Sequence, residues 1–317
     1  MERNEYITKS FELLNDPYSY KKIPKDLLTP LEKSIIDTSF SSYNTYKIKD
    51  AFEFANKING FLLPLGYVLA SFDVTLLFTN IPLELVVSIL TTNYHLIKPN
   101  CTIPKVLLLK LITFLYNNTY FTFLNDFYVQ IKGAPMGGAI SPSLAEIAMN
   151  SLLHYCTREV DFQFPFTYQY VDDLICAVPA NKINYTLNIF ISYNTHLQFT
   201  VQTEKNNIVP FLDTNVSRHE GNTIRLYWYR KKTFSGRYVP FHSYHLDEQK
   251  INIIKGLKNR IERICHPSNY NKNIMLLYEI LRKNHYPKML LNKLLFQDMP
   301  TARTHQQQAI EREAIEL

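Results

Sequence analysis

The chain lacks any hydrophobic run long enough to cross a bilayer. Its best apolar stretch, residues 106–116, is too short and is interrupted by Lys110. The first ten residues, MERNEYITKS, lack the apolar core of a signal peptide. The four cysteines form no CxxC pair. These absences predict an intracellular protein with reduced thiols and no membrane partner.

The composition is that of a globular protein. Of the 317 residues, 46% are hydrophobic and 20% are charged, which allows one large or two modest domains. Residues 218–288 hold 15 Lys and Arg against 5 Asp and Glu, although the whole chain carries a net charge of only +6. A basic C-terminal part is typical of a groove for a polyanion, and a solvated basic face is the alternative.

The hydrophobic pattern predicts alternating helices and strands rather than repeats. Apolar runs rich in β-formers predict strands at 67–74, 167–171, 174–178, 198–203, 209–218 and 223–230, with a hairpin at 120–131. Helical spacing predicts helices at 48–59, from 82 onward, and at 104–116, 142–159 and 182–197, with Ser141 as a cap, and three more helices between 246 and 297. This order predicts an α+β fold with a ferredoxin-like antiparallel sheet and helices on one face.

Three aspartates lie at the ends of predicted strands. Asp73 closes the strand at 67–74, whereas Asp172 and Asp173 join the two strands that follow residue 166. Each motif alone is common as an ordinary turn. If neighbouring strands bring them together, their carboxylates repel one another, and a divalent cation relieves that repulsion. Hard oxygen ligands favour two Mg²⁺ ions, with Mn²⁺ as an alternative, in a site for phosphoryl transfer.

Several segments resemble the reverse transcriptases of Penelope-like retroelements, which are related to telomerase. Residues 71–82 (SFDVTLLFTNIP), 133–142 (GAPMGGAISP) and 170–173 (YVDD) resemble motifs A, B and C. Further along, the resembling segments are 209–213 (VPFLD), 229–238 (YRKKTFSGRY) and 284–287 (NHYP, where the family has NGYP). The resemblance implies a right-hand polymerase with residual fingers at 1–60, a palm at 61–245, a helical thumb-like subdomain at 246–300 and a polar tail at 301–317.

The resemblance also implies roles for individual residues. Asp73 and Asp172 would hold both metal ions, with Asp173 assisting and Val74 contributing its carbonyl. Phe78 falls at the position that selects deoxynucleotides by excluding a 2′-hydroxyl, and a buried core Phe is the alternative. The pocket for nucleotide and template would be lined by Pro135, Met136 and Gly137.

Basic residues complete the expected site. Lys205 lies where a lysine could protonate departing pyrophosphate, although a strand-end lysine is usually just solvated. Lys231, Lys232, Arg237 and Tyr238 alternate charge and ring, which suits a grip on a primer backbone. The implied partners are an RNA template, a DNA primer and deoxynucleoside triphosphates, and the implied location is the nucleus.

The chain departs from the family at two places. PKIHK-type and RPIVS-type finger segments before motif A are not found, nor is a GIY-YIG endonuclease after the thumb. We therefore expect a truncated or rearranged RNA-directed DNA polymerase that binds nucleic acid and Mg²⁺ but extends primers weakly or not at all. A catalytically dead nucleic-acid-binding remnant is the alternative. A metal-dependent nuclease would need a further carboxylate or histidine motif, which the sequence does not offer.

Overall fold

The computed structural model describes residues 46–98, 101, 103–117, 120–123, 126–129, 132–134, 138, 140–231 and 233–296. These residues form two compact units: unit 1 contains residues 46–48 and 66–203, and unit 2 contains residues 49–65 and 204–296. The units divide the chain elsewhere than at the expected boundaries of residues 60 and 245. The reason is that helix α3 (Ala51–Ile58) packs with the C-terminal helices, far away in the sequence.

Unit 1 is built on a four-stranded antiparallel sheet. Its strands are β1 (Tyr67–Val74), β4 (Thr167–Tyr170), β5 (Asp173–Pro179) and β6 (Phe199–Thr203), in the order β4-β5-β1-β6. The elements follow one another as β1, helices, β4, β5, helix and β6, so this is the ferredoxin-like order predicted from the sequence. Strand β1 lies in the centre of the sheet, and this position explains why its sequence is mostly apolar rather than alternating between polar and apolar residues.

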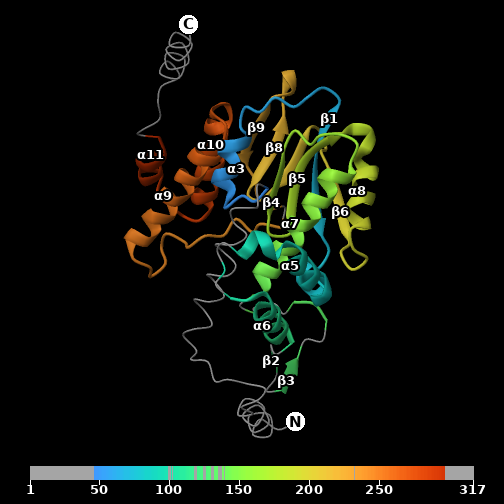
Figure 1. The fold of residues 1–317 in the computed structure, drawn as a ribbon. Helices are drawn as coiled ribbons and strands as arrows, with labels where there is room; N and C mark the ends of the chain where they lie inside the picture. Colours follow the sequence, from blue (N-terminus) through green and yellow to red (C-terminus); the bar gives the residue numbers. More distant parts are fainter. Residues whose placement is uncertain are drawn as a thin grey trace. The chain divides into compact units, whose positions relative to one another are not determined.

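Helices cover one face of this sheet. Figure 1 shows helices α7 (Ser141–Glu159) and α8 (Ile183–Ser192) beside this sheet. Residues of both helices share one core with Ala70, Phe72 and Val74 of β1. The other elements of unit 1 are α4 (Leu77–Asn80), α5 (Leu83–Ile97), α6 (Lys105–Asn117), the hairpin β2 (Tyr120–Phe123) and β3 (Asp126–Val129), and the short 3-10 helix η2 (Ala180–Lys182).

Unit 2 combines a second sheet with four helices. Strands β7 (Ile208–Phe211), β8 (Thr214–Arg218) and β9 (Ile224–Trp228) form an antiparallel sheet, with the 3-10 helix η3 (Glu220–Asn222) before β9. Helices α9 (Asp247–Ile264), α10 (Pro267–Lys283) and α11 (Lys288–Phe296) share one core with Trp228. Asn59, which follows α3, donates to the Ile264 carbonyl at 3.0 Å and accepts from the Leu226 amide at 2.8 Å.

Three sequence-based expectations were wrong in detail. The run 209–218 is two strands, because Leu212 adopts a left-handed backbone (φ 53°) and turns the chain between β7 and β8. Ser141 does not cap α7; it is the first residue of the helix, and Ile140 occupies the capping position without a side-chain bond. Helix α8 ends at Ser192 rather than near residue 197.

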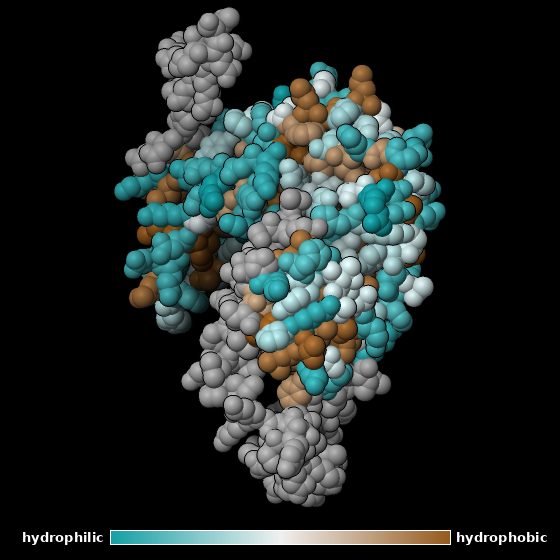
Figure 2. Space-filling model, in the orientation of Figure 1, coloured by the Kyte–Doolittle hydropathy of each residue, from teal (hydrophilic) through white to brown (hydrophobic). Residues whose placement is uncertain are grey.

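The next feature is the distribution of hydrophobic and hydrophilic residues on the helices. No helix among the described residues combines the length and the apolar character that a membrane crossing requires. Figure 2 shows hydrophilic residues over α9 and α10 and a hydrophobic area over α6. That area agrees with the exposure of Val106, Leu107 and Phe114 on α6.

Candidate active site

Asp73 and Asp173 lie in one row that crosses the sheet of unit 1. The antiparallel register places Asp73 of β1 opposite Asp173 of β5, with Tyr170 of β4 and Thr200 of β6 completing the row. Residues directly opposite in a sheet share a face, and this one is the face that α7 and α8 leave uncovered, because Phe72 and Val74 point the other way. The row is accessible to a ligand, since Asp73 and Thr200 are exposed.

Asp172 acts on Asp73 through charge. The pKa of the Asp73 carboxyl is raised, first by partial burial and then by the negative charge of Asp172. A hydrogen bond from the Val74 backbone amide lowers the pKa and only partly offsets these two effects. A cation bound beside Asp73 would offset the repulsion that Asp172 exerts on it. The structure therefore places Asp172 within range of the charge of Asp73, and the strand register places Asp173 opposite Asp73.

The turn that presents Asp172 has an unusual backbone. Val171 adopts φ 56°, which is rare for a β-branched residue, and its side chain is 46% exposed. The buried Gln169 side chain donates to the Val171 carbonyl at 3.0 Å and holds the turn. Strained conformations of this kind persist where the surrounding structure over-determines them, so the position of Asp172 is fixed by its neighbours.

The described residues contain no cluster of three or more His, Cys, Asp or Glu side chains arranged to hold a metal ion. The capacity for a cation therefore rests on Asp73 and Asp172, whose charges interact, and on the register of Asp173. Val74 itself is buried on the helix-covered side, and its main chain lies at the end of β1 beside them.

Phe78 and the glycine-rich loop are joined by their main chains. Phe78 lies in α4, is half-buried and packs against the core of unit 1. Its carbonyl accepts from the Ala134 amide at 2.6 Å. Gly133 has φ +78°, and a Cβ placed there would lie 2.3 Å from the Thr79 carbonyl carbon, so only glycine fits. The role of Phe78 in sugar selection stays a prediction.

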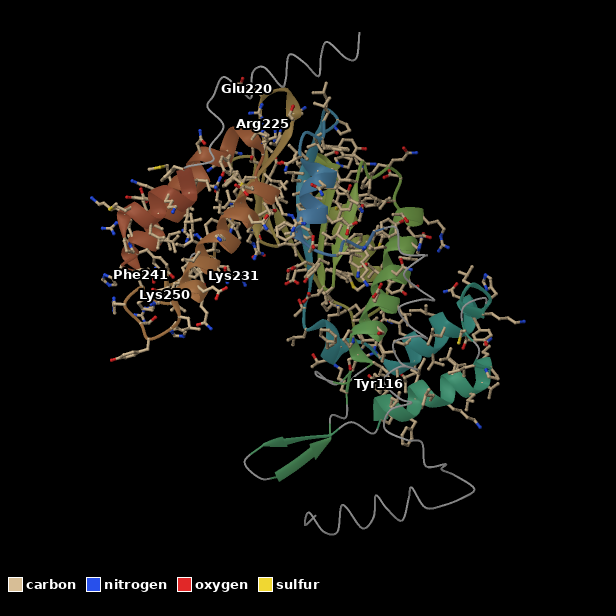
Figure 3. The ribbon with its side chains drawn as sticks, turned by 90° about the vertical axis from the view of Figure 1, so that its left-hand side faces the viewer. Tyr116, Glu220, Arg225, Lys231, Phe241 and Lys250 are labelled. Atoms are coloured by element: carbon tan, nitrogen blue, oxygen red, sulfur yellow. The ribbon has the colours of Figure 1, made fainter. Side chains whose placement is uncertain are left out.

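Tyr116 of α6, labelled in Figure 3, braces the same loop, although no sequence motif indicated it. Its hydroxyl donates to the Ile81 carbonyl at 2.9 Å and accepts from the Gly133 amide. Burial and the charge of Glu84 raise the pKa of the Tyr116 phenol, so it stays protonated and able to donate. Pro135, Met136 and Gly137, the expected lining of the nucleotide pocket, fall outside the described residues, as does Lys232.

Lys205 lies in unit 2, whereas the aspartates lie in unit 1. It is exposed, and it precedes a two-residue hairpin turn in which Asn206 and Asn207 both have positive φ. Its amide and carbonyl pair with those of Ile208 at 2.9 and 3.1 Å. A role in protonating pyrophosphate remains a prediction for Lys205.

The segment 229–238 forms a loop between β9 and α9. Lys231 and Arg237 are exposed, and Figure 3 shows Lys231 in this part of unit 2. Tyr238 is half-buried; its burial raises the pKa of its phenol and the charge of Arg230 lowers it. The Arg230 guanidinium, for which no sequence motif indicated a role, lies 4.7 Å from the centre of the Trp228 ring and 4.8 Å from that of the Phe234 ring.

The NHYP segment explains how this loop is held. The buried Asn284 side chain accepts from the Tyr238 amide at 2.8 Å and donates to the Gly236 carbonyl at 2.7 Å. The Tyr286 hydroxyl donates to the Val239 carbonyl at 3.0 Å. His285 between them has φ 67°, a conformation for which glycine is best suited. The segment is a structural clamp for the basic loop.

The basic residues of helix α9 differ in their exposure to solvent and in their contacts. Lys255 is exposed, but Lys258 is only 12% exposed and pairs with Glu262 at 3.9 Å. The Arg263 guanidinium lies 3.7 Å from the centre of the Phe52 ring. Among the described residues, Lys255 has no ion pair or ring contact that binding to a polyanion would break, unlike Lys258 and Arg263.

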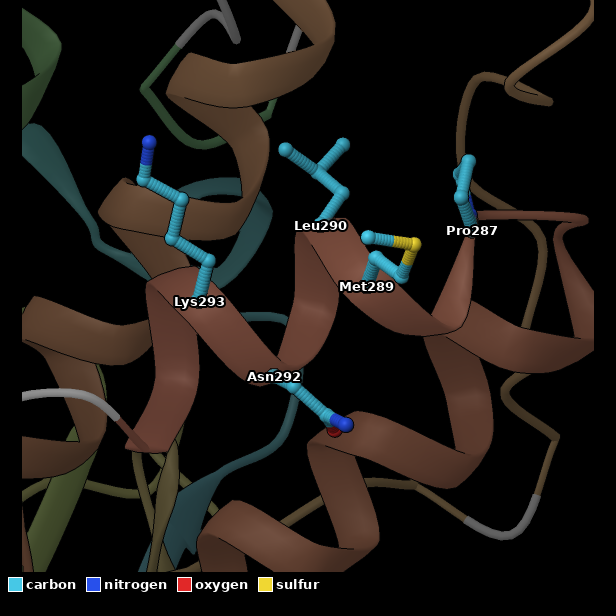
Figure 4. Close-up of a pocket in the computed structure, with 5 residues that line it drawn as sticks. All are labelled: Pro287, Met289, Leu290, Asn292 and Lys293. Carbon is cyan, nitrogen blue, oxygen red and sulfur yellow. The ribbon is translucent and has the colours of Figure 1, made fainter.

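A hollow beside α11 offers little chemistry. It has a volume of about 640 Å³ and is lined by Pro287, Met289, Leu290, Asn292 and Lys293 (Figure 4). Because Lys293 is the one ionisable group among these lining residues, the hollow holds no acid–base pair.

Comparison with protein families finds two matches. The model described as "Reverse transcriptase (RNA-dependent DNA polymerase)" matches residues 16–233, more than half of the chain. The model described as "Animal helix-turn-helix domain" matches residues 237–295. Comparison with curated proteins finds no match.

Solved structures resemble the chain at low identity. Telomerase from Candida albicans, in complex with a fragment of telomeric RNA, is 12% identical with a TM-score of 0.48, over 95% of this chain and 47% of that one. The RNA polymerase complex inside a dsRNA virus is 13% identical with a TM-score of 0.50, over 78% of this chain and 24% of that one. The match thus spans about half the length of the telomerase chain and about a quarter of the length of the viral chain.

Proposed function

Because the chain belongs to the reverse transcriptase (RNA-dependent DNA polymerase) family, we propose that it is an RNA-directed DNA polymerase that adds deoxynucleotides to a primer 3′-hydroxyl. Its fold is the mixed α and β arrangement of right-hand polymerases, with antiparallel sheets. The observation that carries the proposal is the Asp73–Asp172–Asp173 arrangement, where like charges lie at the ends of adjacent strands.

The carboxylates of unit 1 fit a divalent cation. Asp73 is partly desolvated and faces the charge of Asp172, so a bound Mg²⁺ offsets a repulsion that the protein otherwise bears. When bound, such ions neutralise phosphate charge and activate the attacking hydroxyl for in-line displacement. Asp73 and Asp172 would hold two Mg²⁺ or Mn²⁺ ions, with help from Asp173 and the Val74 carbonyl.

The neighbouring segments would shape the nucleotide site. Gly133 lets the glycine-rich loop approach the α4 backbone, and Tyr116 fixes it there. Phe78 would exclude a 2′-hydroxyl, while Pro135, Met136 and Gly137 would line the pocket for nucleotide and template. Preorganised groups of this kind matter because phosphoryl transfer depends on positioning and charge rather than on covalent work by the protein.

The basic parts of unit 2 would hold the strands. Lys231, Lys232, Arg237 and Tyr238 suit a grip on a DNA primer, and the helices α9–α11 suit sequence-independent contact with duplex phosphates in the manner of a thumb. Lys205 would protonate departing pyrophosphate. The motif wording further favours a Penelope-like retroelement and a nuclear location for the protein.

Primer extension tests this function. We expect slow extension of a DNA primer on an RNA template with deoxynucleotides and Mg²⁺, which Asp172→Ala abolishes. The rate is expected to be low because no PKIHK-type or RPIVS-type finger segment is found before motif A. Each preorganised contact to a transferring phosphate that is lost raises the barrier by about 3 kcal/mol, which lowers the rate roughly a hundredfold. Extension that survives Asp172→Ala, or that proceeds only on DNA templates, would contradict the proposal.

A second candidate is a nucleic-acid-binding protein without polymerase activity. It is favoured by the lack, among the described residues, of a three-carboxylate cluster already arranged for metal. It predicts salt-sensitive binding of primer–template duplex, weakened by Lys255→Glu, together with no extension at any enzyme concentration. Lys255 is preferable to Lys258 and Arg263 for this charge reversal, because those two make internal contacts.

A further inference from the structure

A pocket in unit 2 contains a stacked cation. The Arg230 guanidinium lies over the Trp228 ring, 4.7 Å from its centre, and over the Phe234 ring, 4.8 Å from its centre. Together with Lys231, Tyr238 and Arg260, these residues line a cavity of about 330 Å³. That volume lies at the small end of the range for ligand pockets, which spans roughly 300–1,000 Å³.

Two of the three cations that line this pocket, Arg230 and Lys231, have no acidic partner among its lining residues. Three of its lining residues are basic, namely Arg230, Lys231 and Arg260, and one, Asp213, is acidic. Asp213 is already paired with Arg260. Among the described residues, the buried Arg230 Nη1 and Arg260 Nε atoms have no hydrogen-bond acceptor. Buried guanidinium N–H groups without an acceptor are costly, so the pocket favours an anion that supplies one.

Four of the other lining residues are aromatic, namely Trp228, Tyr229, Phe234 and Tyr238. Phe234 is 38% exposed, and its ring lies 5.8 Å from that of Tyr238. Exposed rings beside a basic groove are the feature on which unpaired bases stack, because every base has a flat face. An inorganic anion would use the guanidinium groups but not these rings. The lining therefore matches a ligand that joins a phosphate to a flat heterocycle.

We propose that this pocket binds one unpaired nucleotide of a nucleic-acid strand, with its phosphate on Arg230 and Arg260 and its base against Phe234 and Tyr238. The proposal deepens the strand grip of the proposed function and rests on that function only for the identity of the strand. The binding itself requires neither divalent metal nor the three aspartates.

The pocket contains its own reporter, because Trp228 is the only tryptophan in the chain. Its fluorescence is titrated without divalent metal, using the whole protein and four probes: inorganic phosphate, deoxyadenosine, dAMP and a short oligo(dA). We expect dAMP to change the emission saturably and to bind at least about tenfold more tightly than phosphate or deoxyadenosine. The oligonucleotide is expected to bind more tightly still, since further phosphates meet Lys231.

Variants separate the two halves of the ligand. Arg230→Lys keeps a cation but loses the planar fork, and we expect it to weaken dAMP binding about tenfold or more. Phe234→Leu is expected to bring dAMP affinity down to that of phosphate. Lys272→Gln, an exposed cation on α10 outside the pocket, is the matched control and should bind as wild type does. Asp172→Asn should also bind as wild type, even if it abolishes extension.

Three results would overturn the proposal. Equal affinity for phosphate and dAMP would show that the pocket binds only an anion and does not recognise the base. No change in Trp228 emission with any probe would show that the pocket binds none of them. An oligonucleotide that binds no more tightly than dAMP would remove the assignment to a strand. A loss of primer extension with these titrations intact would instead count against the polymerase alone.

Discussion

Asp73 of β1 lies directly opposite Asp173 of β5 in the antiparallel register of the unit 1 sheet. The pairing brings two negatively charged side chains to one face, where the charge of Asp172 adds to them and raises the pKa of Asp73. Like charges placed opposite each other destabilise a sheet unless something compensates them. A divalent cation at Asp73 and Asp172, as proposed above, would offset the repulsion between these two carboxylates.

Phe78 provides a prediction about sugar selection. If its ring lies under the incoming sugar, shrinking it to valine should raise the incorporation of ribonucleotides relative to deoxynucleotides. The measurement is the ratio of kcat/KM for matched ribo- and deoxynucleoside triphosphates in primer extension. Because Phe78 also packs against the core, unfolding of the variant is measured in parallel. An unchanged ratio in a folded variant would show that the ring serves packing only.

Gly133→Ala should destabilise unit 1 severely. The new Cβ would lie 2.3 Å from Thr79 backbone atoms, and the residue would keep a positive φ. We expect a loss of more than about 2 kcal/mol in the free energy of unfolding, measured with urea. Gly66→Ala is the matched control: Gly66 has φ +82° but no atom within 4 Å of the new Cβ. Equal losses in the two variants would rule out the close approach.

Asn284→Ala should loosen the basic loop. The substitution removes the acceptor for the Tyr238 amide and the donor to the Gly236 carbonyl, in a buried position. Groups left unsatisfied there cost about 1–3 kcal/mol each. We expect faster hydrogen exchange at the Tyr238 amide and lower stability of unit 2. Asn271→Ala, an exposed asparagine of α10, should change neither; unaltered exchange in the Asn284 variant would refute the clamp.

His285→Gly should stabilise unit 2. His285 has φ 67°, which costs an L-residue roughly 1–2 kcal/mol, whereas glycine adds about 0.5–1 kcal/mol of unfolded-state entropy. The difference predicts a gain of about 0.5–1 kcal/mol in the free energy of unfolding. Urea unfolding followed by Trp228 fluorescence measures it. A loss of stability would mean that the imidazole makes a contact worth more than the backbone strain.

The sequence predicted those parts of the fold that depend on local pattern. Strand β1 has the predicted bounds, and β5 begins at Asp173, one residue before the predicted start. The break between β7 and β8 was missed, because Leu212 is a strand-compatible residue in a left-handed turn and no glycine marks it. The packing of α3 in unit 2 was also missed, since it depends on Asn59 meeting residues more than 160 positions away.

The residues of the candidate site also divide into those that a local sequence motif indicates and those that depend on long-range contacts. The sequence singled out the aspartates because their motifs are contiguous, and their role in metal binding stays a prediction. Tyr116 was not found, because its bonds to Ile81 and Gly133 exist only after α6 has packed. Arg230 contacts the Trp228 and Phe234 rings only once the loop after β9 has formed, so no spacing rule indicated it. Long-range contacts of this kind leave no periodic signal in a single sequence.

The most direct test of the central claim is metal binding at the aspartates, measured by calorimetric titration of the whole protein with Mn²⁺. The account predicts binding that Asp73→Asn and Asp172→Asn each weaken at least about tenfold, a loss of about 1.4 kcal/mol. Asp161→Asn is the control, because that aspartate of unit 1 pairs with Lys182 instead. Wild-type affinity in both the Asp73 and Asp172 variants would contradict the account.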